Sequence, residues 1–90
     1  MVKKVAVLVR DRQSEALRMS LGLSLVDDII DVYVLDGKLA GTEQDQLNLE
    51  LMREIGMKIY SNDQRNKEVE YLSTREIAHK LLEYDHVLPY

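Results

Sequence analysis

Val5-Ala6-Val7-Leu8-Val9 is the stretch that decides the fold, because it is a continuous apolar run dominated by β-branched valine. A strand that is buried on both faces has this pattern, whereas a strand with one wet face alternates apolar and polar residues. Ile29-Ile30-Asp31-Val32-Tyr33-Val34-Leu35 is a second such run, and it ends at Asp36-Gly37. Both runs therefore predict interior strands of a sheet that is covered on both faces.

Two helices are predicted after these strands. Ser14 is placed to cap the first one, whose apolar residues recur every four positions at Leu17, Leu21 and Leu25. Thr42 is placed to cap the second helix, and Gly56 stands where a glycine commonly ends one. We expect the second helix to bury an apolar stripe made of Leu47, Leu51, Met52 and Ile55.

The rest of the chain predicts three further strands and a third helix. Residues 57–60 predict a third strand, residues 69–72 a short fourth one and residues 86–90 a final one. Ser73-Thr74-Arg75-Glu76 matches a capping box, with Leu72 and Ile77 as its hydrophobic staple. We expect the helix that follows to bury Ile77, Leu81 and Leu82.

The resulting order of elements is β-α-β-α-β-β-α-β. Because strands alternate with helices over short connections, we expect one domain over residues 1–90. Its predicted class is α/β: a three-layer α/β/α sandwich around a mostly parallel sheet of about five strands.

Composition limits the classes of partner. The chain has 90 residues, a net charge of -4 and no cysteine. A domain of this size buries only roughly 60% of its unfolded surface, so we expect a partner surface. The acidic balance argues against nucleic acid, and no apolar run approaches the roughly 20 residues that span a bilayer. We therefore expect a cytoplasmic protein without nucleic-acid or membrane partners, and without disulfides or thiol chemistry.

Polar and charged side chains follow the predicted strands, where ligands bind in parallel α/β sheets. The helix beginning near Ser14 favours a small anion, since free N–H groups and the helix dipole attract negative charge. We expect a ligand-binding site made of Arg10, Arg12, Asp36, Ser61, Asn62 and Arg65. The alternative is a set of solvated charged loops, and no glycine-rich nucleotide motif is present.

Catalytic signals are weak. An enzyme built on His79 or His86 would need a positioned carboxylate and one cleft shared with Ser61 or Asp63. Ser61 has no nucleophile-elbow motif, and the simpler interpretation is a serine that caps a turn with Asn62 and Asp63. Two histidines at unsuitable spacing are a poor metal site, so we expect neither a metal nor a cofactor.

Five tyrosines lie in or beside the predicted strands and the last helix: Tyr33, Tyr60, Tyr71, Tyr84 and Tyr90. Tyrosine suits interfaces because its ring is apolar and its hydroxyl is satisfied at an edge. Half-buried packing is the alternative for each one, but as a group they favour an association surface.

Three stretches carry a family resemblance. The first stretch is a strand followed by an Ala/Leu-rich helix, at residues 5–9 and 15–23. The second is a strand and its turn, at residues 32–37. The third is a closing strand-helix-strand, at residues 69–88. In this arrangement the chain resembles the DsrE/DsrF/DsrH-like family, which includes the Tus sulfur-relay subunits. The resemblance covers nearly the whole chain.

The resemblance implies a fold and a tendency to form oligomers, but it does not imply a sulfur-carrier role for this chain. Members of the DsrE type place a persulfide-carrying cysteine just after the third strand, where this chain has Ser61. Serine cannot hold a persulfide, so we expect no residue of this chain to act as a sulfur carrier. We expect a non-catalytic DsrE-like subunit or interaction module that forms a homo-oligomer or a hetero-oligomer with a related subunit, as a structural partner in sulfur relay. The alternative is a small-ligand or anion-binding α/β domain with its site at the strand carboxyl ends.

Overall fold

The computed structural model describes residues 3–23, 29–39 and 41–89. Its centre is a sheet of five strands in the order β4-β3-β2-β1-β5, and every pairing is parallel. The strands are β1 (Lys4–Val9), β2 (Ile29–Val34), β3 (Lys58–Ser61), β4 (Glu70–Tyr71) and β5 (His86–Pro89). Strand bounds differ from the expected ones by one or two residues, and β3 extends to include Ser61.

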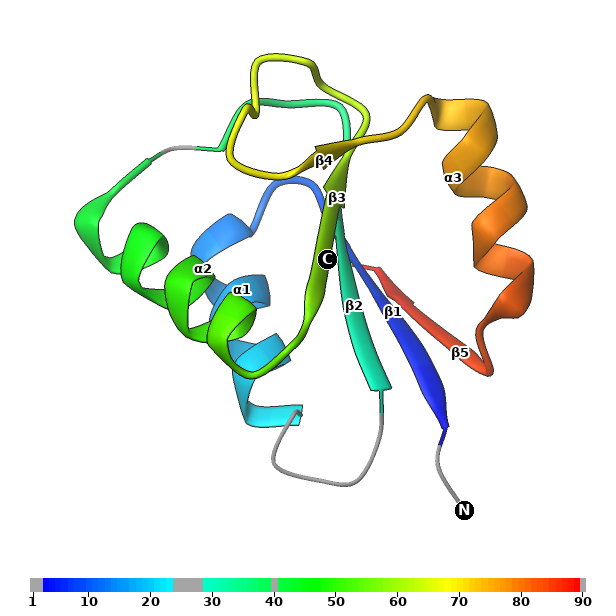
Figure 1. The fold of residues 1–90 in the computed structure, drawn as a ribbon, viewed down its shortest axis with the longest axis horizontal. Helices are drawn as coiled ribbons and strands as arrows, with labels where there is room; N and C mark the ends of the chain where they lie inside the picture. The colour runs from blue at the N-terminus through cyan, green and yellow to red at the C-terminus, as the bar shows by residue number, and fades with distance from the viewer. Residues whose placement is uncertain (1–2, 24–28, 40, 90) are drawn as a thin grey trace.

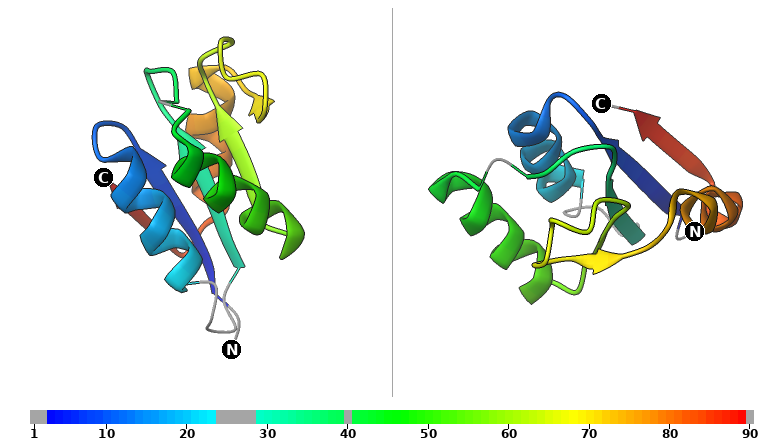
Figure 2. Two further views of the ribbon diagram at one scale, coloured as in Figure 1. Left: turned by 90° about the vertical axis from the view of Figure 1, so that its left-hand side faces the viewer. Right: turned by 90° about the horizontal axis from the view of Figure 1, so that it is seen from above.

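Helices cover both faces of this sheet. α1 (Gln13–Leu23) and α2 (Glu43–Glu54) lie on one face, as Figure 1 shows at the left of the sheet. α3 (Thr74–Lys80) and a 3₁₀ turn (Leu81–Glu83) lie on the other. The views in Figure 2 show the same three layers. The predicted α/β class, the three layers and the element order are therefore confirmed.

The strands supply a core on each side of the sheet, because neighbouring residues of a strand point to opposite faces. Val5, Val7 and Val9 pack toward α1 and α2, whereas Ala6 packs toward α3. The α1/α2 side also buries Leu17, which is fully inaccessible, as predicted. The continuous apolar run at the start of the chain thus serves both cores, which is why it does not alternate.

Three of the predicted helix signals are confirmed and one is wrong. Thr42 Oγ1 accepts the Asp45 amide, Ser73 and Glu76 form the reciprocal capping box, and Gly56 ends α2 with a φ of 84°. Ser14 is not a cap, because α1 begins at Gln13. Its hydroxyl instead donates to Asp45 Oδ1 at 2.9 Å, across the contact between α1 and α2.

The predicted buried stripe of α2 is confirmed for Met52 and wrong for its other three residues. Leu47, Leu51 and Ile55 are 55%, 50% and 55% exposed, and the helix buries Asp45, Asn48 and Leu49 beside Met52. Consecutive helical residues point about 100° apart, so a rotation of α2 that turns Asp45, Leu49 and Met52 inward leaves the predicted leucines on the outer side. Polar contacts decide the rotation, since Asp45 bonds Ser14 on α1 and the Arg53 guanidinium donates to the Glu68 carbonyl.

The third helix departs from its prediction near its end. Ile77 is buried and Leu81 is partly buried, but Leu82 is 80% exposed. The α-helix stops at Lys80, and the 3₁₀ turn that follows advances three residues per turn, which swings Leu82 outward. Leu25 and Tyr90 lie outside the described residues. No helix within the described ranges is long and apolar enough to cross a bilayer.

Candidate functional site

The loops after β2 and β3 meet at the carboxyl edge of the sheet, and Asn62 joins them. Asn62 Oδ1 accepts the Asp36 amide at 2.8 Å, and Nδ2 donates to Asp36 Oδ1 at 3.0 Å and to Thr74 Oγ1 at 2.9 Å. Asp36 has a left-handed φ of 57°, a conformation that aspartate tolerates better than most residues. Asn62 therefore connects the end of β2, the end of β3 and the first turn of α3.

Ser61 lies fully buried at the end of β3. Its hydroxyl oxygen accepts the Asp63 amide at 3.0 Å and Asn66 Nδ2 at 2.9 Å. The first of these bonds is the turn cap that the sequence indicated. Ser61 is thus an inaccessible serine that holds the loop after β3.

Asn66 is the buried residue that sequence reasoning missed. Its Nδ2 also donates to the Gly37 carbonyl at 2.9 Å, and its Oδ1 accepts the Leu39 amide at 2.7 Å. The side chain is thereby bonded to both loops, and the residue is only 6% exposed. Its one sequence signal was an amide residue in the polar run after a strand, a signal that Asn62 shares.

Asp63 and Arg65 form a close ion pair on the loop after β3. Arg65 Nη2 lies 2.6 Å from Asp63 Oδ2, and Nε donates to both carboxylate oxygens. Hydrogen bonds from the Arg65 side chain, and then from its backbone amide, lower the pKa of Asp63 to about 2. The same pair raises the pKa of Arg65. Asp63 is therefore an ionised partner of Arg65 and is unsuited to work as a general base near neutral pH.

The six predicted ligand-binding residues do not form one site. Arg10 Nε lies 3.9 Å from Asp36 Oδ2, so Arg10, Asp36 and Asn62 are connected. Ser61 is bonded to Asn66, and Arg65 to Asp63. Arg12 lines a separate depression at the start of α1, together with Asp11, Gln13, Ser14 and Glu15. Most of the predicted set therefore holds the loops together.

A cavity of about 430 Å³ lies between the two loops and the first turns of α2. Lys38 and Gly41 line it from the loop after β2, and residues 65–68 line it from the loop after β3. Of the six predicted residues, Arg65 belongs to this cavity.

The tyrosines mostly belong to the core beneath α3. Tyr33 is fully buried and stacks on Tyr60 with ring centroids 5.0 Å apart. Tyr84 Oη lies 2.7 Å from Tyr33 Oη and donates to the buried Asp31 carboxylate. Burial raises the pKa of Tyr33 to about 12 and also raises the pKa of Tyr84. The expectation of a tyrosine association surface is wrong for Tyr33 and Tyr60, whereas Tyr71 is 44% exposed.

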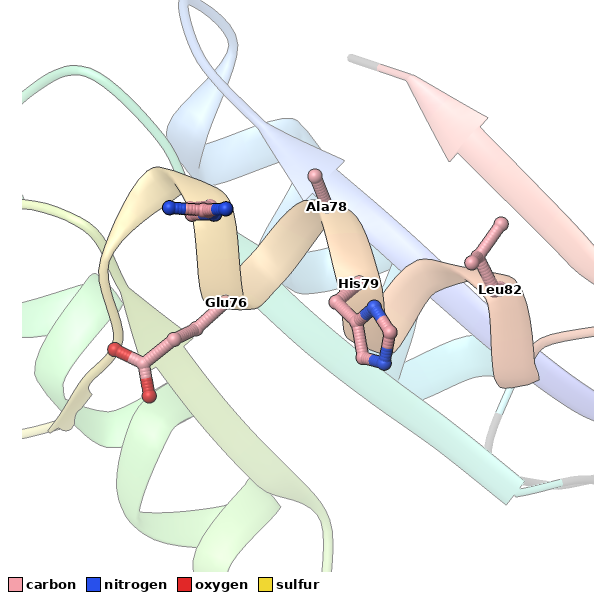
Figure 3. Close-up of a pocket in the computed structure, with 5 residues that line it drawn as sticks. Glu76, Ala78, His79 and Leu82 are labelled. Carbon is pink, nitrogen blue, oxygen red and sulfur yellow. The ribbon is translucent and has the colours of Figure 1, made fainter.

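The histidines lie apart from Ser61. Figure 3 shows His79 on α3 beside Glu76, Ala78 and Leu82, and these residues with Arg75 line an open depression on the outer face of that helix. The depression includes neither Ser61 nor Asp63. His86 lies at the start of β5, paired with Val5. The depression beside His79 is therefore not the cleft with Ser61 or Asp63 that an enzyme using His79 would require.

Comparisons with protein-family models, with curated proteins and with solved structures find no match for this chain. The resemblance to the DsrE-like family, drawn from sequence patterns, therefore stays a prediction.

Proposed function

We propose that this chain is a non-catalytic assembly subunit, an interaction module of the DsrE-like type that binds a second protein chain. In this proposal it forms a homo-oligomer or a hetero-oligomer with a related, cysteine-bearing subunit and acts in the cytoplasm as a structural partner in sulfur relay. Its own residues perform no persulfide chemistry, because it has no cysteine.

The observation that carries the proposal is the α2 stripe, defined as Leu47, Leu51 and Ile55. These residues recur every four positions, so they lie along one face of the helix. All three are at least half exposed, although α2 already buries Leu49 and Met52 on the face toward the sheet. A row of half-exposed aliphatic side chains, on a helix that buries its other face, is typical of a protein–protein contact.

Energetics set a requirement for the partner. Completing the burial of these three half-exposed side chains contributes about 2–4 kcal/mol. Association costs about 4 kcal/mol or more in lost translational and rotational freedom. The partner must therefore contact surface beyond the α2 stripe, and a related domain with a helix of its own at this place offers that area.

Light scattering after size-exclusion chromatography tests the proposal when it covers about a hundredfold range of concentration. We expect a mass above that of the monomer, either for the chain alone or after mixing with a cysteine-bearing DsrE-like subunit. A chain that stays monomeric at every concentration and forms no complex in that mixture overturns the proposal.

A further inference from the structure

We propose that the cavity between the loops after β2 and β3 binds a small molecule through a phosphate or sulfate group. The binding residues are Lys38, Arg65 and Lys67, of which only Arg65 was expected in a ligand site. This inference does not depend on the assembly proposal, because the cavity and the α2 stripe have no residue in common.

Positive charge dominates the lining of the cavity. Lys38, Arg65 and Lys67 line it, and Glu68 is the one acidic residue among the described residues that do. Within the described residues, neither Lys38 nor Lys67 forms a salt bridge. The charge of Lys38 does act on Asp63, where it helps to lower the pKa of that carboxylate. An anionic ligand would nevertheless displace no salt bridge from either ammonium group.

Arg65 also lines the cavity, and its ion pair with Asp63 uses only part of its guanidinium group. Its bonds to Asp63 use Nε and Nη2, which leaves Nη1 for a ligand oxygen. The ion pair also restrains the guanidinium group before any ligand arrives. A restrained donor loses less conformational entropy on binding than a free side chain does.

Asn66 gives the cavity a fixed shape. Asn66 belongs to the wall of the cavity that the loop after β3 forms. Its buried side-chain amide bonds the Gly37 carbonyl and the Leu39 amide of the opposite wall, which the loop after β2 forms. The distance between the two sets of cations is thus set by the fold, so binding requires little rearrangement of the loops.

The donor set indicates the class of ligand. The ammonium groups of Lys38 and Lys67 and the guanidinium group of Arg65 supply more hydrogen-bond donors than a carboxylate has oxygens. A tetrahedral oxyanion has more oxygens, so it can accept hydrogen bonds from both walls of the cavity. The volume of about 430 Å³ falls within the range of small-molecule sites and exceeds the space that one inorganic anion needs. The ligand is therefore a small molecule whose phosphate or sulfate group lies between the two walls.

Amide chemical shifts measured during titration test this inference, with sodium phosphate, sodium sulfate and sodium acetate as probes at constant ionic strength. Phosphate and sulfate are expected to give saturable shifts at residues 38–39 and 65–68. Acetate is expected to bind about tenfold more weakly, since it lacks the third oxygen. Equal binding of acetate, or shifts spread evenly over the surface, overturns the proposal.

Matched lysine variants separate the site from the general charge of the protein. Lys38→Gln combined with Lys67→Gln is expected to raise the Kd for phosphate at least about tenfold, because two charge-assisted contacts are lost. Lys58→Gln combined with Lys80→Gln removes the same number of charges, at the amino end of β3 and at the end of α3, where neither residue lines the cavity, and is expected to leave the Kd unchanged. An equal loss in both variants contradicts the site.

Discussion

The hydroxyl of Ser14 on α1 donates to Asp45 Oδ1 on α2 at 2.9 Å, and this bond explains how the two helices fit together. Asp45 is only 1% exposed, and its Oδ2 has no hydrogen-bond partner among the described residues. The contact occupies the face of α2 that an apolar stripe was expected to fill. As a result, Leu51 and its neighbours in the α2 stripe remain outside.

Removing the Ser14 hydroxyl is expected to destabilise the fold. Ser14→Ala leaves a buried carboxylate without its donor, which costs about 1–3 kcal/mol of unfolding free energy. Urea unfolding of Ser14→Ala, Asp45→Ala and the double variant measures the coupling between the two side chains. Effects that add within about 0.5 kcal/mol would show that the bond contributes nothing.

Asn66 is expected to matter more for stability than Asn62. Asn66→Ala removes three bonds from a buried position and leaves the Leu39 amide unsatisfied, at a cost of about 2–4 kcal/mol. Asn62→Ala removes hydrogen bonds that are exposed to solvent, so it is expected to lower the free energy of unfolding by about 1 kcal/mol. Chemical unfolding of both variants gives the comparison, and equal losses would contradict the structural role of Asn66.

Lowering the pH is expected to reduce the stability of the fold, because Asp63 becomes protonated. Its pKa is about 2 in the folded state and 3.8 as a free side chain, so the unfolded state binds more protons between these values. Stability from the pair with Arg65 is complete above about pH 4 and declines as the pH falls toward about 2. Thermal unfolding across this range should show a smaller decline for Asp63→Asn than for the wild type. Parallel profiles for the two proteins would contradict the lowered pKa.

Alkaline titration probes the tyrosine cluster beneath α3. Burial keeps the phenol of Tyr33 protonated in the folded state up to about pH 12, against 10.0 for a free side chain. This contribution to stability is present below pH 10 and is lost as the pH rises toward 12. Ultraviolet absorbance of tyrosinate should therefore show Tyr33 ionising only well above pH 10, together with unfolding. Ionisation of Tyr33 near pH 10 while the fold persists would be the opposite result.

The sequence predicted the architecture because the relevant signals are local. The apolar run at residues 5–9, the Thr42 cap and the Ser73 capping box each specify an element without reference to the rest of the chain. Hydrophobic periodicity failed where polar side chains decide the packing. In α2, Asp45 and Asn48 occupy buried positions, and a pattern rule that seeks leucine cannot anticipate this.

The candidate site was harder to predict, because its residues act through contacts between loops. Ser61, Asn62 and Arg65 are close in sequence, yet each bonds a different partner. Asn66 could be recognised only once Gly37 and Leu39 were placed beside it. The cations around the cavity likewise come from two segments that the fold brings together.

The most direct test of the central claim compares the assembly of two sets of surface variants by light scattering. One replaces the α2 stripe, with Leu47→Gln, Leu51→Gln and Ile55→Gln together, and the other is Leu82→Gln on the opposite face of the sheet. Circular dichroism spectra of both variants serve as the control that each one folds. We predict that the stripe variant loses the assembly seen for the wild type, whereas Leu82→Gln keeps it. A stripe variant that assembles as well as the wild type would contradict the account.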